Sequence, residues 1–404
     1  MFDRSHFERL DAADPLAHLR QSFTLPDGVI YFDGNSLGPL PSHVPDVVQR
    51  TVVEEWGHDL IRSWNDHGWW DLAERVGERI APLIGAPPGS VVAGDTTTLA
   101  LYKAVAAARR LRPDRPVILT DTGNFPTDLY VLGSVAEQAG ARVVTVPPDQ
   151  LVERIGADVA VVSVTHVDYR TGRRHSITDI DVAAREAGAL VVWDLSHSAG
   201  AMDLDLGESD FAVGCGYKYL NGGPGAPAFL YVHPRHQADF HNPIAGWWGH
   251  AEPFAMEPVY RPAPGAARTQ TGTQSILGLA ALGAALDVFD GVDPRALRVK
   301  SEKLVADFIG LVDERLPWFE VVTPRSPEDR GSHVSLAHPE AGRIMAALID
   351  RGVVGDVRPP NLLRFGLAPA YQRHVEVWDA VEAVRGVMEN DAWRHAPLHT
   401  GPVT

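Results

Sequence analysis

Short apolar runs alternate with amphipathic segments between about residues 90 and 235 of this chain. The runs are apolar on both faces, which is typical of strands buried within a mostly parallel sheet. The segment 180–187 has helical spacing and stops at Gly188, a residue suited to the left-handed end of a helix. We therefore predict a wound α/β domain. Its expected strands are 117–120, 142–145, 159–164, 190–193, 211–214 and 228–232.

The pattern changes after about residue 275. Helical stretches near 276–289, 297–315, 341–351 and 375–388 surround two strand-like runs, near 331–336 and 362–367. This mixture indicates an α+β layer and a second, smaller domain. We expect an N-terminal segment (residues 1–45) that packs at the active site and on the small domain. A large α/β domain (46–275) and the small domain (276–404) then follow.

Composition narrows the class of protein. The chain has 404 residues, 45% of them hydrophobic and 22% charged, as in ordinary globular proteins. A net charge of −16 argues against nucleic acid or an anionic membrane as a partner. No apolar run approaches the length of a membrane span, and the N-terminus does not resemble a signal peptide. The single cysteine excludes a disulfide framework and an all-cysteine metal site. We expect a cytoplasmic protein without a bound metal.

Two residues carry the main chemical prediction. Asp194 ends the apolar run 190–193, at the edge of the sheet where α/β proteins bind ligands. Lys218 follows another short strand and opens a glycine-rich loop, 222–225. Pyridoxal phosphate chemistry requires an amine that forms a Schiff base and an acid that keeps the pyridine nitrogen protonated. The pair therefore predicts pyridoxal 5'-phosphate as cofactor.

Other residues support this prediction, and each also has a structural interpretation. Thr97 and Thr98 open a helix and could bind a phosphate or only cap the helix. Phe125 could stack on the cofactor ring, and His197 could lie against it or be a core histidine. Arg364 lies inside an apolar run, so it needs an anionic partner. That partner could be a substrate α-carboxylate held bidentately, or a protein carboxylate.

Together these segments resemble the kynureninase family. The resemblance runs from about residue 10 to 390, and the first motif and the lysine loop are specific beyond other pyridoxal phosphate enzymes. The segments that carry it are 31–38, 61–65, 124–128, 165–172, 193–200, 217–225, 246–250 and 364–366.

The resemblance implies a fold-type-I pyridoxal phosphate enzyme, with the aspartate-aminotransferase fold. It implies a homodimer, with active sites at the interface, that hydrolyses L-kynurenine to anthranilate and L-alanine. Lys218 would be the Schiff-base lysine and Asp194 the partner of the pyridine nitrogen, and we choose Tyr217 as candidate proton donor. The implied cofactor-binding residues are Thr97, Thr98, Phe125, Asp128, Thr165, Asp194, His197, Tyr217, Lys218, Trp247 and Thr273. The implied substrate-binding residues are Arg364, Trp64, Ser36 and Gly272.

The chain departs from the family pattern at a few positions. Asp168 replaces the usual asparagine, Ser196 the usual alanine and Trp248 the usual phenylalanine. The residues Trp64, Gly272 and Thr273 follow the bacterial pattern, which implies kynurenine rather than 3-hydroxykynurenine as substrate.

Two other enzyme classes share this fold. A cysteine desulfurase-like lyase needs a mobile cysteine in the second domain, whereas the only cysteine, Cys215, lies three residues before Lys218. An aminotransferase shares the early chemical steps and stays open. A cofactor-binding regulator would need a DNA-binding segment or a basic patch, and the sequence shows neither.

Overall fold

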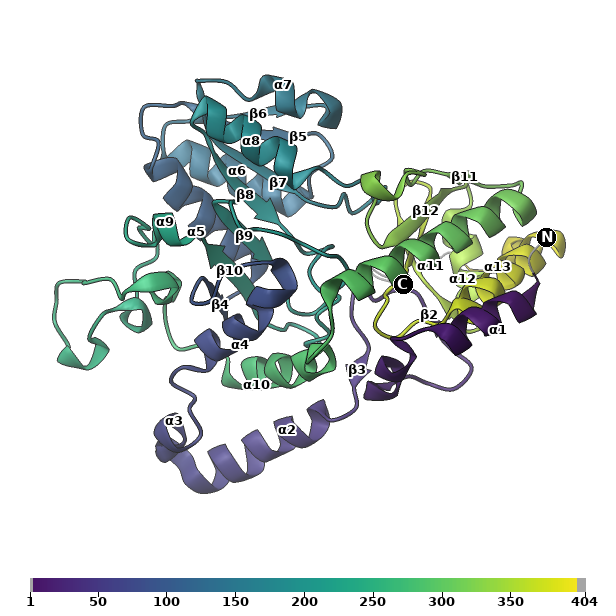
Figure 1. The fold of residues 1–404 in the computed structure, drawn as a ribbon, viewed down its shortest axis with the longest axis horizontal. Coiled ribbons are helices and arrows are strands. Elements are labelled where there is room, and N and C mark those ends of the chain that lie inside the picture. Colours follow the sequence, from purple (N-terminus) through teal and green to yellow (C-terminus); the bar gives the residue numbers. More distant parts are fainter. Residues whose placement is uncertain (1–2, 398–404) are drawn as a thin grey trace.

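A seven-stranded sheet forms the centre of the larger domain in the computed structural model, which describes residues 3–397 (Figure 1). Five neighbouring strands are parallel, and β10 is antiparallel to both of its neighbours. All six predicted strands are confirmed, within one residue at each end. Across the sheet the order is β4 (Val91–Gly94), β10 (Ala228–Val232), β9 (Phe211–Gly214), β8 (Leu190–Asp194), β7 (Val159–Thr165), β5 (Val117–Asp121) and β6 (Arg142–Val146).

Helices cover both faces of this sheet. On β7, Val161 points into one apolar cluster and Val162 into the other, because successive side chains of a strand alternate between faces. One cluster includes α5 (Thr97–Arg110) and α6 (Pro126–Gln138). The other includes α4 (Leu72–Ile80), α8 (Ile177–Ala187) and α10 (Ile276–Ala285). The sheet is thus buried on both sides, as its apolar runs predict.

The smaller domain contains a four-stranded antiparallel sheet and three helices. Its strands are β11 (Glu320–Val321), β12 (His333–Ala337), β15 (Leu362–Gly366) and β14 (Asp356–Arg358), in that spatial order. Its helices are α11 (Pro294–Arg315), α12 (Ala341–Ile349) and α13 (His374–Glu389). The helices and strands predicted after residue 275 are all confirmed.

The N-terminal segment packs on the smaller domain. Helix α1 (Arg4–Ala13) lies along α13, and Phe7 and Phe32 are part of that domain's apolar core (Figure 1). Strand β2 (Ile30–Tyr31) pairs with β13 (Val353–Val354) in parallel. Strands β1 (Phe23–Thr24) and β3 (Leu40–Pro41) pair with each other before the chain enters the larger domain.

The sequence pattern predicts no helices between residues 44 and 80, whereas the structure has several there. Helix α2 (Val44–Arg50) continues into a π-helical segment, Thr51–Asp59, and projects from the body of the molecule before α3 (Ser63–Asp66) (Figure 1). The short helices α7 (Leu151–Arg154) and α9 (Pro234–Gln237) complete the elements. No helix within residues 3–397 has the length and apolarity needed to cross a bilayer.

Helix α10 bears on the proposed domain division. Leu279 and Leu282 belong to the core cluster of the large sheet, and α10 packs on α2 and α4. This packing favours a boundary nearer residue 290 than 276. The division into 1–45, 46–275 and 276–404 therefore stays a proposal, and residues 1–2 and 398–404 of it lie outside the described part.

Candidate active site

Lys218 and Asp194 meet in one cavity of about 150 Å³ at the carboxyl edge of the large sheet. Asp194 is the last residue of β8, and Lys218 follows the end of the neighbouring strand β9 by four residues. Parallel strands bring their carboxyl ends to one edge, so the topology explains why both groups lie there. The lining residues are Thr97, Thr98, Phe125, Thr127, Asp128, Thr165, Tyr169, Asp194, Ser196, His197, Tyr217 and Lys218.

His197 is the direct neighbour of the lysine amine. Its Nε2 lies 3.1 Å from Lys218 Nζ, and its ring is buried. Burial and the nearby Lys218 charge lower the pKa of His197 well below its ordinary value. The imidazole is therefore neutral at pH 7, and a neutral ring nitrogen can accept a hydrogen bond from the lysine.

Two buried carboxylates, Asp194 and Asp128, line the same cavity. Asp194 Oδ1 accepts a hydrogen bond from the Ser196 backbone N–H at 2.7 Å. Burial raises the pKa of Asp194, and the Ser196 hydrogen bonds and Lys218 oppose this rise. Burial and then the charge of Asp194 raise the pKa of Asp128 well above its usual range. Among the described residues, no group forms a hydrogen bond with Asp128 Oδ2. This arrangement fits a cationic ring nitrogen, which would compensate both carboxylates.

The start of α5 fits a phosphate group. Thr96 caps the helix by accepting a hydrogen bond from the Leu99 backbone N–H at 3.4 Å. Thr97 and Thr98 form its first turn and line the cavity. Backbone N–H groups of a first turn lack helical partners, and the helix dipole favours anions there. The cavity thus has an amine, a ring-nitrogen partner and a phosphate-binding end.

Aromatic and hydroxyl groups shape the space between these ends. Phe125 meets Tyr169 edge to face, with ring centroids 5.0 Å apart and planes at 89°. Thr165 Oγ1 donates to Asn124 Oδ1 at 2.5 Å, which fixes the threonine on the cavity wall. The sequence interpretation gave Tyr169 no role, although it follows Asp168 within a recognised motif.

Arg364 is buried in the smaller domain and already has a carboxylate partner. Its Nε donates to Asp356 Oδ1 at 2.8 Å, and its Nη2 contacts Asp356 Oδ2. Nη2 also donates to Ser36 Oγ at 2.9 Å, and Nη1 to the Tyr169 carbonyl at 2.6 Å. The Nε–Nη2 edge of the guanidinium is therefore occupied by Asp356, one of the two partners that the sequence left open, and binding of a substrate carboxylate by Arg364 stays a prediction.

Arg358 is a second guanidinium in this network, and the sequence interpretation missed it. Its Nη2 donates to Asp356 Oδ2 at 2.6 Å and to Ser36 Oγ at 3.3 Å. Asp356 and Arg358 alternate along β14 on the same face as Arg364 of the adjacent β15. The signal that could have identified them is a carboxylate and a guanidinium two residues apart in a short strand, beside a strand that contains an arginine.

Six of the expected site residues do not line this cavity in the described chain: Arg364 and Ser36, which belong to the network above, and four more. Trp64 packs on Trp248 at 5.2 Å between ring centroids, and Trp247 packs on Trp70 at 5.8 Å. Thr273 is exposed, and Gly272 beside it has open space around it. The structure therefore brings together the residues expected around the amine, the ring and the phosphate, but separates the set Trp64, Trp247, Gly272 and Thr273 from them.

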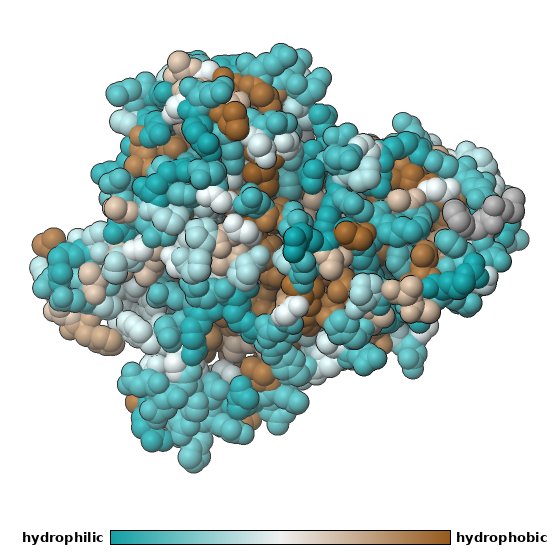
Figure 2. Space-filling model, viewed as in Figure 1, coloured by the Kyte–Doolittle hydropathy of each residue, from teal (hydrophilic) through white to brown (hydrophobic). Residues whose placement is uncertain are grey.

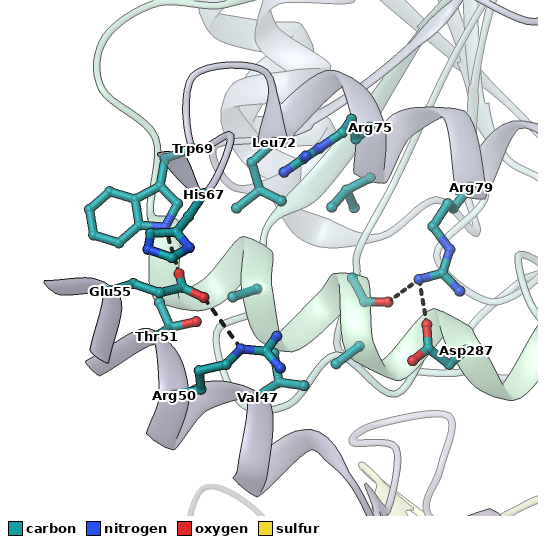
Figure 3. Close-up of a pocket in the computed structure, with 14 residues that line it drawn as sticks. Val47, Arg50, Thr51, Glu55, His67, Trp69, Leu72, Arg75, Arg79 and Asp287 are labelled. Atoms are coloured by element: carbon teal, nitrogen blue, oxygen red, sulfur yellow. Dashed lines mark hydrogen bonds and ion pairs between the residues drawn. The ribbon is translucent and has the colours of Figure 1, made fainter. Parts of the chain in front are cut away.

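A second cavity, of about 370 Å³, lies between α2, α4 and α10 (Figure 3). There, Glu55 Oε2 accepts a hydrogen bond from Trp69 Nε1 at 2.8 Å, and Glu55 Oε1 forms an ion pair with Arg50 Nε at 3.5 Å. Arg79 pairs with Asp287 on the other wall. None of the expected site residues lines it, so we assign it no chemistry.

Comparison with known proteins decides the family. A model described as the kynureninase C-terminal domain matches residues 297–384. A kynureninase of Burkholderia pseudomallei (strain 1106a) is 48% identical over 397 residues, which is 95% of each chain. A kynureninase of Pseudomonas fluorescens is 48% identical over 407 residues, which is 98% of each chain. The chain belongs to the kynureninase family.

Solved structures confirm the fold. The family's fold-type-I architecture is shared with a cysteine desulfurase from Thermococcus onnurineus NA1, with a TM-score of 0.77 at 20% identity over 93% of this chain and 98% of that one. A variant of C-DES with glycine covalently linked to its pyridoxal phosphate cofactor has a TM-score of 0.78 at 17% identity, over 95% and 99% of the chains. At these identities the likeness concerns the fold alone.

The departures from the family pattern leave the site intact. Asp168 Oδ1 accepts from the Arg170 and Thr171 backbone N–H groups at 3.0 and 2.6 Å, a turn that asparagine could also form. Ser196 adds a side-chain hydrogen bond that lowers the pKa of Asp194. Trp248 packs on Trp70 with ring centroids 4.1 Å apart.

Proposed function

We propose that this enzyme hydrolyses L-kynurenine to anthranilate and L-alanine, with pyridoxal phosphate bound to Lys218. The observation that carries the proposal is the single cavity that holds Lys218, Asp194 and the first turn of α5. Family membership supports the substrate. A desulfurase-like reaction is less well supported, because Cys215 is 3% exposed and burial raises the pKa of its thiol.

Each residue of the cavity has a defined task in this proposal. Bound pyridoxal phosphate supplies an electron sink for the charge released at the substrate α-carbon. Asp194 and Asp128 hold a proton on the ring nitrogen, and Thr97 and Thr98 bind the phosphate. Lys218 takes and returns the proton at the α-carbon, and His197 accepts a hydrogen bond from its amine.

Tyr217 is the proposed donor of the proton to the β-carbon that remains after anthranilate has left and that becomes the methyl group of L-alanine. Burial raises the pKa of its phenol, so the group keeps its proton throughout the neutral range. Its ring lies 5.9 Å from Lys218 Nζ. A positioned donor of this kind typically contributes about 10²–10⁴ in rate.

The test is product analysis with purified holoenzyme and L-kynurenine. Fluorescent anthranilate and an equal amount of L-alanine should form without added keto acid. The variant Lys218→Ala should lose about 10³-fold or more of this activity and keep its fold by circular dichroism. Product formation that requires pyruvate or 2-oxoglutarate would instead identify an aminotransferase.

The same assay decides between two substrates. Trp64, Gly272 and Thr273 follow the bacterial pattern, so we propose that kcat/KM is higher for L-kynurenine than for 3-hydroxykynurenine. Higher efficiency on the hydroxylated compound would contradict this assignment and leave the reaction type standing.

We further propose a homodimer in which each subunit completes the site of the other. Trp247 is 41% exposed and Thr273 is exposed, and neither lines the cavity of its own chain. Large apolar side chains are also exposed near these segments, namely Trp56, Ile61, Phe254 and Met256. Figure 2 shows further apolar residues in the middle of one face, where the two domains meet. Exposed apolar surface of this extent favours a protein interface.

A further inference from the structure

His333 is a buried histidine that no protein group in the described chain hydrogen-bonds. His333 is 0% exposed, and neither of its ring nitrogens, Nδ1 and Nε2, has a hydrogen-bond partner among the described residues. Buried polar groups without a partner are rare because their desolvation is not compensated. The sequence interpretation included this position only as part of a strand. Its ring therefore requires an explanation that packing does not give.

Strand pairing places His333 beside Arg364. His333 is opposite Gly366, and Ser335 is opposite Arg364, in the antiparallel pair β12–β15. His333 and Arg364 are thus diagonal neighbours on one face of the small sheet, within reach of long side chains. This face turns toward the large domain, because Arg364 donates to the Tyr169 carbonyl. The His333 ring also lies 5.6 Å from the ring of His197.

The charges around His333 leave a positive balance, since Asp356 alone pairs with both Arg364 and Arg358. Arg364, Arg358 and Lys218 act on His333, and all three are cationic. Together with burial, they hold the pKa of His333 well below its usual value. The ring is therefore neutral at pH 7 and offers one N–H donor. A neutral donor among cations is well suited to bind a carboxylate.

A carboxylate bound next to Arg364 needs a second hydrogen-bond donor. Asp356 occupies the guanidinium edge formed by Nε and Nη2, and one N–H of Nη1 is used by Tyr169. With that edge taken, Arg364 cannot hold both oxygens of another carboxylate side-on. A substrate carboxylate beside it would find its second hydrogen bond on a neighbouring group.

We propose that His333 donates a hydrogen bond to the substrate α-carboxylate, next to Arg364, and so helps to select α-amino acids. The assignment rests on the proposed function, since it requires an α-amino acid at Lys218. His333 is then a specificity-determining residue supplied by the smaller domain.

The experiment compares two ligands on the holoenzyme by titrating its visible absorbance. L-Alanine carries the carboxylate, and ethylamine is its counterpart without one. His333→Phe keeps a ring and removes the donor, so it should weaken L-alanine binding about 10- to 100-fold and change ethylamine binding by less than about threefold. His333→Gln keeps an N–H donor and should restore most of the alanine affinity. His338→Phe, the same substitution where the ring packs on Phe319 instead, is the matched control.

Stability separates this role from a structural one. Replacing an unpartnered imidazole by an apolar ring should leave the thermal midpoint of the protein unchanged or raise it. Failure of His333→Phe to fold, or equal loss of both ligands, would overturn the proposal. So would unchanged alanine binding. Normal alanine binding without kynurenine hydrolysis in the parent enzyme would contradict the proposed reaction and leave this subsite intact.

Discussion

At the scale of single residues, the site contains two carboxylates that a bound cofactor would stabilise. Without the cofactor, the same carboxylates destabilise the folded protein. Asp128 and Asp194 are buried together, and the charge of Asp194 contributes to the raised pKa of Asp128. Without a cation between them, ionising both carboxylates is unfavourable. The apoprotein should therefore lose stability as the pH rises.

Asp128→Asn tests this directly. Because the folded pKa of Asp128 lies above its unfolded value, ionisation destabilises the fold once the pH exceeds about 4. The amide cannot ionise, so the variant should gain stability over the parent by about 1 kcal/mol or more between pH 5 and pH 8. Urea unfolding of the apoprotein at both pH values measures it, with Asp114→Asn at an exposed position as control. A gain that is equal at both pH values would contradict the explanation.

The pair Arg364–Asp356 predicts unequal effects at two arginine contacts. Asp356→Ala leaves the Arg364 guanidinium, which is 0% exposed, without a carboxylate and should cost about 3–5 kcal/mol of unfolding free energy. Arg358→Ala removes the other contact of Asp356, but its side chain is 32% exposed, so about 1 kcal/mol or less is expected. Denaturant unfolding compares the two variants. Similar losses of unfolding free energy would show that Arg364 does not depend on Asp356 more than Arg358 does.

At the scale of elements, close backbone contact rather than helix propensity determines where glycine is required. On α4, a Cβ at Gly77 would lie 2.1 Å from the Val91 carbonyl oxygen of β4. Gly77→Ala should therefore destabilise the protein by roughly 1–3 kcal/mol, although alanine normally favours a helix. Gly310 of α11 has open space around it, so Gly310→Ala should raise the free energy of unfolding by about 0.5–1 kcal/mol. Thermal unfolding checks the opposite signs, and two changes of the same sign would refute the contact argument.

The elements also show what the sequence could and could not predict. Buried parallel strands are short runs that are apolar on both faces, so the runs ending at Asp194 and Gly214 are predicted within a residue. The π-helical segment Thr51–Asp59 has no comparable local pattern, and neither do the packed tryptophans Trp64, Trp70, Trp247 and Trp248. The partner of Arg364 was missed because Asp356 meets it only through the pairing of β14 and β15. For the same reason, a role for His333 can be inferred only from the pairing of β12 with β15.

At the scale of the whole molecule, the incomplete cavity predicts shared active sites. Lys218→Ala and Trp247→Ala proteins should each be nearly inactive. After subunit exchange, half of the dimers are mixed, and each mixed dimer has one intact site if Trp247 serves the partner. About a quarter of the parent activity should then return. Exchange that is verified by native mass spectrometry but restores nothing would place Trp247 in the site of its own chain.

The core shared by Phe7, Phe32 and residues 304–396 has a consequence for synthesis. Phe7 and Phe32 fill an interior otherwise built from residues 304–396, and β2 lies against β13. On the ribosome, Phe7 and Phe32 must therefore stay undocked until the residues up to about 396 have emerged. A fragment beginning at residue 297 would lack two aromatic rings of its own interior and should not fold unaided.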